Sequence, residues 1–598
     1  MAEKKPSIKY TSRDFTTIKN DLLDYAKRYY PNQFRDFSAN SFGSLMLDTV
    51  SYVGDILSFY LDYQVNESFI TTAIERKNIL KIAQQLGYKP RLTTASYGTL
   101  TFFILIPANV TGAPDFNYAP ILKAGSVFKT AGGKTFSLLE DVNFKDQDNN
   151  EIVVGDVNSD TGVPTTYAVR ARGQAISGEL FVKEITIGEY EKFLRIRIAD
   201  DNISEIVTVN DSEGNVYFEV DYLSQNVVYI PLVNKNADKN TVANIMKPIS
   251  VPRRFVTVIE DGEVFLQFGA GTNENVEEIL DPANVFLERH GKKHITDDSF
   301  DPNTLTETDS LGVSPSQTTM TVIYRKNDFS NSNAAVGSIT VVDQTVFDFE
   351  QTDNLNTAQL NSTRESLEVI NEEQFIGSNT FVSNDQIRER AFGTYAMQNR
   401  IVTEQDLITA TYAMPGKFGS IKKASVIQDN DSFNQRNINL YVISEDINSN
   451  LSPASLSIKN NLKTYLSGFK MINDSIDILD AKIINLQINF KVVSYPDTNK
   501  FATLDSAKNS LVGFFRDRKN FDIGEPFKIT DVFNVLKNDS LVLDVEEVTV
   551  TRKNGTSYAD SNFNIEESKD KTGRIINCPR DSIFEIKFPN ADIVGTVK

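Results

Sequence analysis

Few residues in this chain of 598 have the types and spacing that catalysis or metal binding requires. The two histidines, His290 and His294, occur in HGKKH, and their four-residue spacing would place both on one face of a helix, as a metal-binding pair requires. Gly291 weakens a helix there, and no glutamate follows the first histidine as in the HExxH pattern. We therefore expect no metal site, and no nucleophile motif lies near either histidine.

Two glycine-containing stretches look like nucleotide-binding loops but lack a required residue. AGGKT at 131–135 would need a glycine at position 128, where the chain has Phe128. The run Gly269-Ala270-Gly271 would need a third glycine at position 274, where the chain has Glu274. We interpret both stretches as turns, and predict no bound cofactor.

Carboxylates are too numerous for the sequence to single out a catalytic pair. The chain has 80 acidic residues, and any two of them could be the acid and base of a hydrolase. Asp297, Asp298 and Asp301 lack the ligand alternation and the glycine of a calcium loop, so a solvated loop is the simpler interpretation. The sequence therefore predicts a protein that is not an enzyme.

Composition restricts the partners and the compartment. With 61 basic against 80 acidic residues, the net charge is -19, and no segment supplies the basic surface that direct nucleic-acid binding needs. The single cysteine, Cys578, excludes an intramolecular disulfide. We find neither a signal peptide nor a membrane-spanning run, so we expect assembly in the cytoplasm and no membrane insertion.

The first ninety residues have the pattern of three helices. Ser12 is placed to cap a helix over 13–29, and Thr72 with Glu75 has capping-box spacing before a third helix. Apolar residues at three- and four-residue intervals in the second and third helices form a candidate partner-bundle face: Phe42, Leu45, Leu57, Tyr60, Ile79, Ile82 and Leu86. These helices have more apolar side chains than they need to cover one another. The excess either packs on the β region that follows or is shared with helices of other chains.

The remaining sequence predicts a multidomain α+β protein, with a helical N-terminal region, a central, mostly antiparallel β domain and C-terminal α+β domains. We expect an exposed polar linker at 296–318. The predicted boundaries are 1–92 for the helices, 93–275 for the β-rich domain, 276–378 for a linker with irregular and β structure, 379–470 for a helical pair with an α+β domain, and 471–598 for a C-terminal α+β domain that is a candidate for self-association.

The stretch from Ser383 to Lys422 has the most specific pattern in the chain. Ser383 and Gln386 have capping-box spacing, and Thr403 is placed to cap a second short helix. Pro415-Gly416 then ends that helix. Asp406, one turn into the second helix, favours its N-terminus and lies near enough in sequence to pair with Arg400. Such a pair is either an exposed ion pair that contributes little to stability or a contact that fixes the angle between the helices.

This stretch resembles the signature of baseplate J-like proteins, and the candidate signature residues are Arg400, Thr403, Asp406, Pro415 and Gly416. Further similar stretches are 75–90, 260–272 and 470–550, and the likeness is strongest to the wedge ring protein of large contractile-tailed phages. The resemblance implies a structural subunit of the tail baseplate in a virion. It also implies two copies in each of six wedges around the hub, bound to other wedge proteins and to each other, and a rearrangement that triggers sheath contraction.

Two other classes of function remain open at this point. A surface adhesin or other polymer-binding β protein fits the β-rich middle, although the helical N-terminus counts against it. A tail-associated hydrolase fits the abundant carboxylates, although we find no catalytic motif. Complex formation with neighbouring gene products would distinguish a ring subunit from both.

Overall fold

The computed structural model describes residues 13–30, 41–146, 150–159, 161–233, 244–260, 262–271, 311–327, 332–350, 355–378, 382–429, 436–517 and 521–598. His290, His294 and the aspartates at 297, 298 and 301 lie outside these ranges. The chain divides into two compact units. Unit 1 comprises residues 1–90 and 382–398, and unit 2 comprises residues 91–381 and 399–598.

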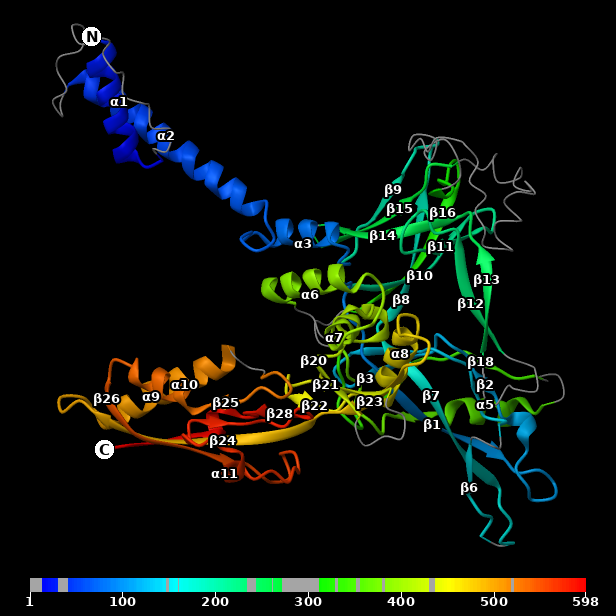
Figure 1. The fold of residues 1–598 in the computed structure, drawn as a ribbon. Coiled ribbons are helices and arrows are strands. Elements are labelled where there is room, and N and C mark those ends of the chain that lie inside the picture. The colour runs from blue at the N-terminus through cyan, green and yellow to red at the C-terminus, as the bar shows by residue number, and fades with distance from the viewer. Residues whose placement is uncertain are drawn as a thin grey trace. The chain divides into compact units, whose positions relative to one another are not determined.

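Unit 1 is helical. Its described helices are α1 (Phe15–Tyr29), α2 (Phe42–Glu67), α3 (Arg76–Gln85) and α6 (Asn384–Met397) (Figure 1). Asp14 caps α1 by accepting a hydrogen bond from the Thr17 backbone N–H, whereas the predicted cap, Ser12, lies outside the described residues. Ser41 caps α2 in the same way, by accepting a bond from the Ser44 N–H.

The predicted capping box of the third helix is wrong. A side chain of the preceding helix accepts the hydrogen bonds of the N–H groups at the start of α3 instead. Glu75 is the N-cap residue but makes no side-chain capping bond, and the Thr72 hydroxyl donates to the Asn66 carbonyl. The carboxylate of buried Glu67, at the end of α2, accepts bonds from the Ile74 N–H at 2.8 Å and the Asn78 side-chain amide at 2.8 Å. Glu67 thereby fixes the turn between α2 and α3.

The core of unit 1 lies between α3 and α6, which come from distant parts of the sequence. Ile79 and Ala83 of α3 pack with Ile387 and Ala391 of α6 in one buried cluster. The Arg388 guanidinium ties α6 to the α2–α3 turn by donating to the Ile70 carbonyl at 2.8 Å and also to that of Ala73. Residues 382–398 are therefore part of the N-terminal helical unit.

The central region of unit 2 consists mainly of two seven-stranded sheets (Figure 1). The first has the order β17-β3-β4-β7-β1-β19, with β6 on β7: β1 (Tyr97–Pro107), β3 (Val127–Thr130), β4 (Thr135–Leu138), β6 (Glu151–Val154), β7 (Thr166–Ser177), β17 (Ile339–Gln344) and β19 (Glu368–Ile370). The second has the order β8-β16-β10-β11-β14-β15-β9: β8 (Glu179–Thr186), β9 (Arg195–Ile198), β10 (Ile203–Asp211), β11 (Val216–Glu219), β14 (Arg254–Glu260), β15 (Glu263–Phe268) and β16 (Thr319–Lys326). All pairs except β11 with β14 are antiparallel.

Smaller elements complete this region. They are a 3-10 helix η1 (Phe116–Tyr118), the three-stranded sheet of β2 (Ile121–Leu122), β5 (Val142–Asn143) and β18 (Phe347–Asp348), the ribbon of β12 (Val227–Val233) and β13 (Asn244–Ser250), and α5 (Thr357–Glu365). The described end of the predicted polar linker is not exposed, because residues 312–315 are buried and Val313 pairs with Gly271. The expectation of an exposed linker is therefore wrong for this part of 296–318.

The C-terminal part of unit 2 combines two four-stranded sheets with helices. The first part contains α7 (Glu404–Ala413), η5 (Gly416–Phe418), β20 (Lys423–Gln428), β21 (Asn437–Glu445), β22 (Leu451–Ser452), α8 (Leu456–Ser467) and β23 (Ser475–Asp480). The second part contains β24 (Lys482–Ser494), α9 (Lys500–Asp517), β25 (Phe527–Lys528), α10 (Ile529–Lys537), β26 (Val542–Arg552), α11 (Ile565–Ser568), β27 (Ile575–Ile576), β28 (Ser582–Glu585), α12 (Pro589–Asp592) and β29 (Ile593–Val597). The predicted fold class, a helical N-terminus, an antiparallel β middle and a C-terminal α+β region, is confirmed.

Candidate assembly surfaces

Helix α2 packs its small and polar side onto α1. Ser44 and Ser51 are buried, and a Cβ on Gly54 would lie 3.2 Å from Ile18 of α1. An ion pair between Lys19 and Asp48 at 2.6 Å and one between Arg13 and Asp62 at 3.0 Å join the two helices at this side. Small side chains let the two helices approach closely, so the contact with α1 buries little of the apolar surface of α2.

The opposite side of α2 exposes the large apolar side chains. Its members are between 50% and 75% exposed: Phe42, Leu45, Met46, Val50, Tyr52, Val53, Leu57, Phe59, Tyr60 and Leu61. Met46, Val50, Val53, Leu57 and Tyr60 follow alternating four- and three-residue steps, the spacing with which helices pack into coiled coils. We call these ten residues the α2 apolar face. A helix of an isolated globular protein buries such a stripe, and this one leaves it in solvent.

The structure divides the seven residues of the predicted bundle face between two environments. Phe42, Leu45, Leu57 and Tyr60 belong to the exposed α2 apolar face. Ile79 has no exposed surface, and Ile82 and Leu86 pack against the α3–α6 cluster. The three residues of α3 thus hold unit 1 together, and the surface that remains available to another chain is that of α2.

The central signature has two capping boxes, where its spacing predicts a capping box at Ser383 and a cap at Thr403. The Ser383 side chain accepts from the Gln386 N–H, and the Gln386 side chain accepts in return from the Ser383 N–H. Thr403 and Asp406 form the same reciprocal pair, at 3.1 Å and 2.9 Å. The Asp406 carboxylate also accepts from the Val402 N–H at 3.2 Å. In the described part of the chain no ion pair joins exposed Arg400 with Asp406, whose carboxylate holds the backbone of α7 instead.

The rest of the signature connects α7 to the start of the β region. Gly416 is buried, and its carbonyl accepts a hydrogen bond from the Ala95 N–H at 3.3 Å. A Cβ at position 416 would lie 3.3 Å from the Leu92 carbonyl oxygen, so the close approach favours glycine. Pro415 precedes it as the N-cap residue of η5.

The two helices of the signature belong to different units, which their sequence pattern does not indicate. Helix α6 is part of unit 1, and α7 is part of unit 2. Between them, Gln398 and Asn399 both adopt left-handed backbone conformations, with φ of 49° and 59°. Left-handed backbone conformations at two consecutive residues other than glycine are uncommon.

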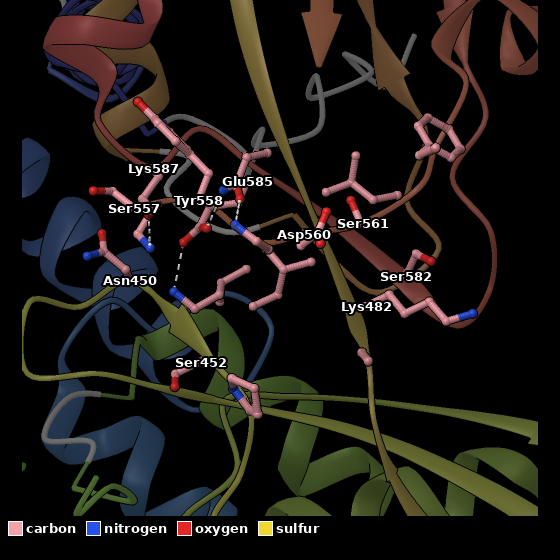
Figure 2. Close-up of a pocket in the computed structure, with 18 of the residues that line it drawn as sticks. Asn450, Ser452, Lys482, Ser557, Tyr558, Asp560, Ser561, Ser582, Glu585 and Lys587 are labelled. Carbon is pink, nitrogen blue, oxygen red and sulfur yellow. Dashed lines mark hydrogen bonds between the residues drawn. The ribbon is translucent and has the colours of Figure 1, made fainter. Parts of the chain in front are cut away.

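A groove of about 1080 Å³ lies in unit 2 between β22 and the C-terminal sheet (Figure 2). The Lys482 ammonium pairs with Asp581 at 2.8 Å, and the Lys587 ammonium donates to the Ser557 carbonyl at 2.7 Å. Glu585 is buried in the wall, where one carboxylate oxygen accepts from the Leu451 N–H at 2.7 Å and the other from the Asn485 amide at 2.8 Å. These contacts join strands β22, β24 and β28.

The buried carboxyl of Glu585 makes the stability of the fold depend on pH. Burial raises the pKa of the Glu585 carboxyl, and the hydrogen bonds from Leu451 and Asn485 oppose that effect only in part. A carboxyl whose folded-state pKa is raised stabilises the fold at low pH, and this contribution is lost as the pH rises through the folded pKa. We therefore expect the unfolding free energy of the native chain, relative to that of Glu585→Gln, to increase as the pH falls from 7 to 4. If the difference in unfolding free energy between the native chain and Glu585→Gln does not vary with pH in denaturant titrations, the pKa of Glu585 is not raised.

No group of three or more histidine, cysteine, aspartate or glutamate side chains that could hold a metal ion occurs among the residues that the structure describes. None of the described helices combines the length and the apolarity that crossing a bilayer requires. Burial raises the pKa of the Cys578 thiol to about 12, so this cysteine is a poor nucleophile.

Comparison with known proteins assigns the helical N-terminus to a class. Residues 14–85, which contain α1, α2 and α3, match the family model of the bacteriophage baseplate protein, N-terminal domain. The match supports a baseplate protein of a phage-like particle, and it covers the α2 apolar face.

Among solved structures, the chain is similar to one in the cryo-EM structure of the anti-feeding prophage (AFP) baseplate, 6-fold symmetrised. The sequence identity is 10%, and the alignment covers 98% of this chain and 100% of that chain. The TM-score is 0.28, which is too low to support an argument about the fold. No curated protein matches the chain.

Proposed function

We propose that this chain is a wedge subunit of the inner ring that surrounds the hub in a contractile phage tail baseplate. The observation that carries the proposal is the α2 apolar face, which lies within the residues that match a baseplate N-terminal domain. A helix that buries its small polar side and exposes its large apolar side is built to be completed by helices of other chains. Those partners are the other wedge proteins and a second copy of this chain.

The proposed role includes transmission of the host-binding rearrangement that triggers sheath contraction. A subunit that does this needs separate interfaces linked by connections that tolerate a change of angle. The division into two units supports this part of the proposal, since the helices that offer the apolar face belong to one unit and the β sheets to the other. A homodimer within a sixfold ring, with contacts between C-terminal domains, follows from the resemblance to J-like wedge proteins.

We propose that this chain has a structural role and no catalytic activity. The groove in unit 2 uses Lys482, Lys587 and Glu585 to hold the chain together, which supports a scaffold more than a hydrolase. An adhesin or a hydrolase would function without the neighbouring gene products of a tail cluster, and a ring subunit would not.

Co-expression with the products of neighbouring tail genes tests the proposal. We expect the chain to co-purify in a stoichiometric hetero-complex, and we expect negative-stain electron microscopy of assembled baseplates to place it in a sixfold ring. A chain that stays monomeric in size-exclusion chromatography with all of these products present would exclude the ring assignment and favour an adhesin.

A further inference from the structure

A second exposed apolar surface lies in unit 2, far along the sequence from the N-terminal helices. Strands β1 and β7 pair over their whole length, from Tyr97 with Ile176 to Pro107 with Thr166. The short strand β6 pairs with the start of β7, from Glu151 with Arg170 to Val154 with Tyr167 (Figure 1). We call the described residues of β6 and of the loops 108–114 and 155–165 the ribbon end.

The two loops of the ribbon end contact each other. The Tyr167 hydroxyl donates to the Gly112 carbonyl at 2.5 Å, and the Ala108 N–H donates to the Thr165 carbonyl at 2.9 Å. A Cβ on Gly112 would lie 3.3 Å from Val163. The ribbon end is therefore one continuous surface that is ordered by its own hydrogen bonds.

Exposed aliphatic side chains gather on this surface. They are Val110, Val153, Val154, Val157 and Val163, with Leu105 of β1 beside them. Adjacent residues of a strand point to opposite faces, so Val153 and Val154 leave an exposed valine on each face of β6. A contiguous group of exposed aliphatic side chains of this kind marks an interaction surface.

The outer edge of β6 is open to a further strand. Among the described strands, β6 pairs with β7 alone. Proteins protect exposed edges with lysine, proline, a bulge or a very short strand, and the four-residue strand β6, Glu-Ile-Val-Val, has neither lysine nor proline. Its unpaired backbone groups and its valines together fit an extended segment of another chain.

The charge of the ribbon end defines the chemistry of that segment. Residues 104–118 and 150–169 contain aspartate and glutamate but no lysine, arginine or histidine. The nearest cation at the base of β6, Arg170, already bonds Glu151 at 2.8 Å and also Glu372. A second copy of this surface or an anionic membrane would meet like charge, whereas a basic segment would meet complementary charge.

We propose that the ribbon end binds an extended segment of another protein, one that alternates aliphatic with lysine or arginine residues and adds as a strand to the edge of β6. This inference uses no residue of the N-terminal helices. It therefore stands or falls independently of the ring assignment.

The test uses the full chain and a synthetic peptide that alternates lysine and valine, with a glutamate–valine peptide of the same length as the charge control. We expect the lysine peptide to bind in isothermal titration and to slow amide hydrogen exchange at residues 151–154. Val153→Lys should weaken this binding about tenfold by like-charge repulsion and loss of the apolar contact. Val182→Lys is the matched control, because Val182 lies on the edge strand β8 and has the same exposed fraction, 64%, as Val153.

Several results would overturn the proposal. They are failure of the lysine peptide to bind, equal binding of the glutamate peptide, an equal loss of binding in Val182→Lys and Val153→Lys, and stronger binding of the chain to anionic vesicles than to the peptide. Circular dichroism of both variants establishes that each is folded before binding is measured. Retention of binding in folded Val153→Lys would likewise exclude β6 as the site.

Discussion

The double substitution Val50→Asp with Leu57→Asp should abolish the hetero-complex with the baseplate partners and leave the chain folded. The two residues lie one heptad apart on the α2 apolar face, and both point away from α1. Apolar anchors at the centre of an interface each contribute about 2 kcal/mol or more. Two buried carboxylates in their place add a desolvation cost, so we expect an affinity loss of more than about 100-fold.

The control for this prediction is the same charge change elsewhere on the surface. Val182→Asp with Ile472→Asp also replaces two exposed aliphatic side chains, and both positions lie in unit 2. Co-purification and analytical ultracentrifugation of the two double variants compare them directly. Normal complex formation by Val50→Asp with Leu57→Asp, or an equal loss in the control, would remove α2 as the assembly surface.

Point substitutions test this surface better than removal of residues 1–90. Helix α3 packs against α6, and Arg388 of α6 bonds the α2–α3 turn. A truncated chain would therefore expose Ile387 and Ala391, and loss of assembly could follow from misfolding of α6. Substitution on the solvent side of α2 leaves these contacts intact.

The sequence predicts best where a local pattern determines the structure. The capping box at Ser383 and the cap at Thr403 follow from spacing alone, and both are present. The start of α3 depends on a contact that the sequence does not reveal, because the Glu67 carboxylate accepts a hydrogen bond from the Ile74 N–H. Ser455 caps α8 by accepting from the Ile458 N–H, and α10 begins at Ile529 with no side-chain capping bond.

Long-range pairing could not be predicted. Strands β16, β17 and β19 complete the central sheets by pairing with strands that precede them by more than a hundred residues. Alternation of apolar residues predicts that a strand exists, but it does not select the partner. The same limit applied to α6, whose pattern in sequence fits its neighbour α7 but whose packing is with α3.

The exposure of the α2 apolar face was one of two outcomes that the sequence allowed. Apolar spacing predicts that a face will be buried, but it does not identify the chain that buries it. The side of the helix that packs within the chain is marked by small residues, since Ser44, Ser51 and Gly54 lie at the contact with α1. These small residues, seven and three positions apart, are visible in the sequence and are a usable sign of the side that packs within the chain.

Gly269 explains why a stretch that resembles a nucleotide-binding loop is rich in glycine. A Cβ at this position would lie 2.0 Å from the Gly312 carbonyl oxygen and 2.3 Å from that of Leu311. Both are backbone atoms, so no side-chain rotation relieves the overlap. The adjacent Gly271 N–H donates to the same Gly312 carbonyl at 2.9 Å, which holds the two segments together. Glycine is needed here for close backbone approach and not for a turn or a phosphate.

Gly269→Ala should therefore destabilise unit 2 by about 3 kcal/mol, the upper part of the usual range for overpacking, since residues 311–313 would have to move. That segment has little freedom, because a Cβ on Gly312 would itself lie 2.8 Å from the buried Arg254 side chain. Gly188→Ala is the matched control, since no atom lies within 4 Å of the Cβ position there. Thermal and urea unfolding of the two variants measure the difference. If Gly269→Ala unfolds at the same denaturant concentration as Gly188→Ala, the two backbone segments separate without cost and their contact does not stabilise the β region.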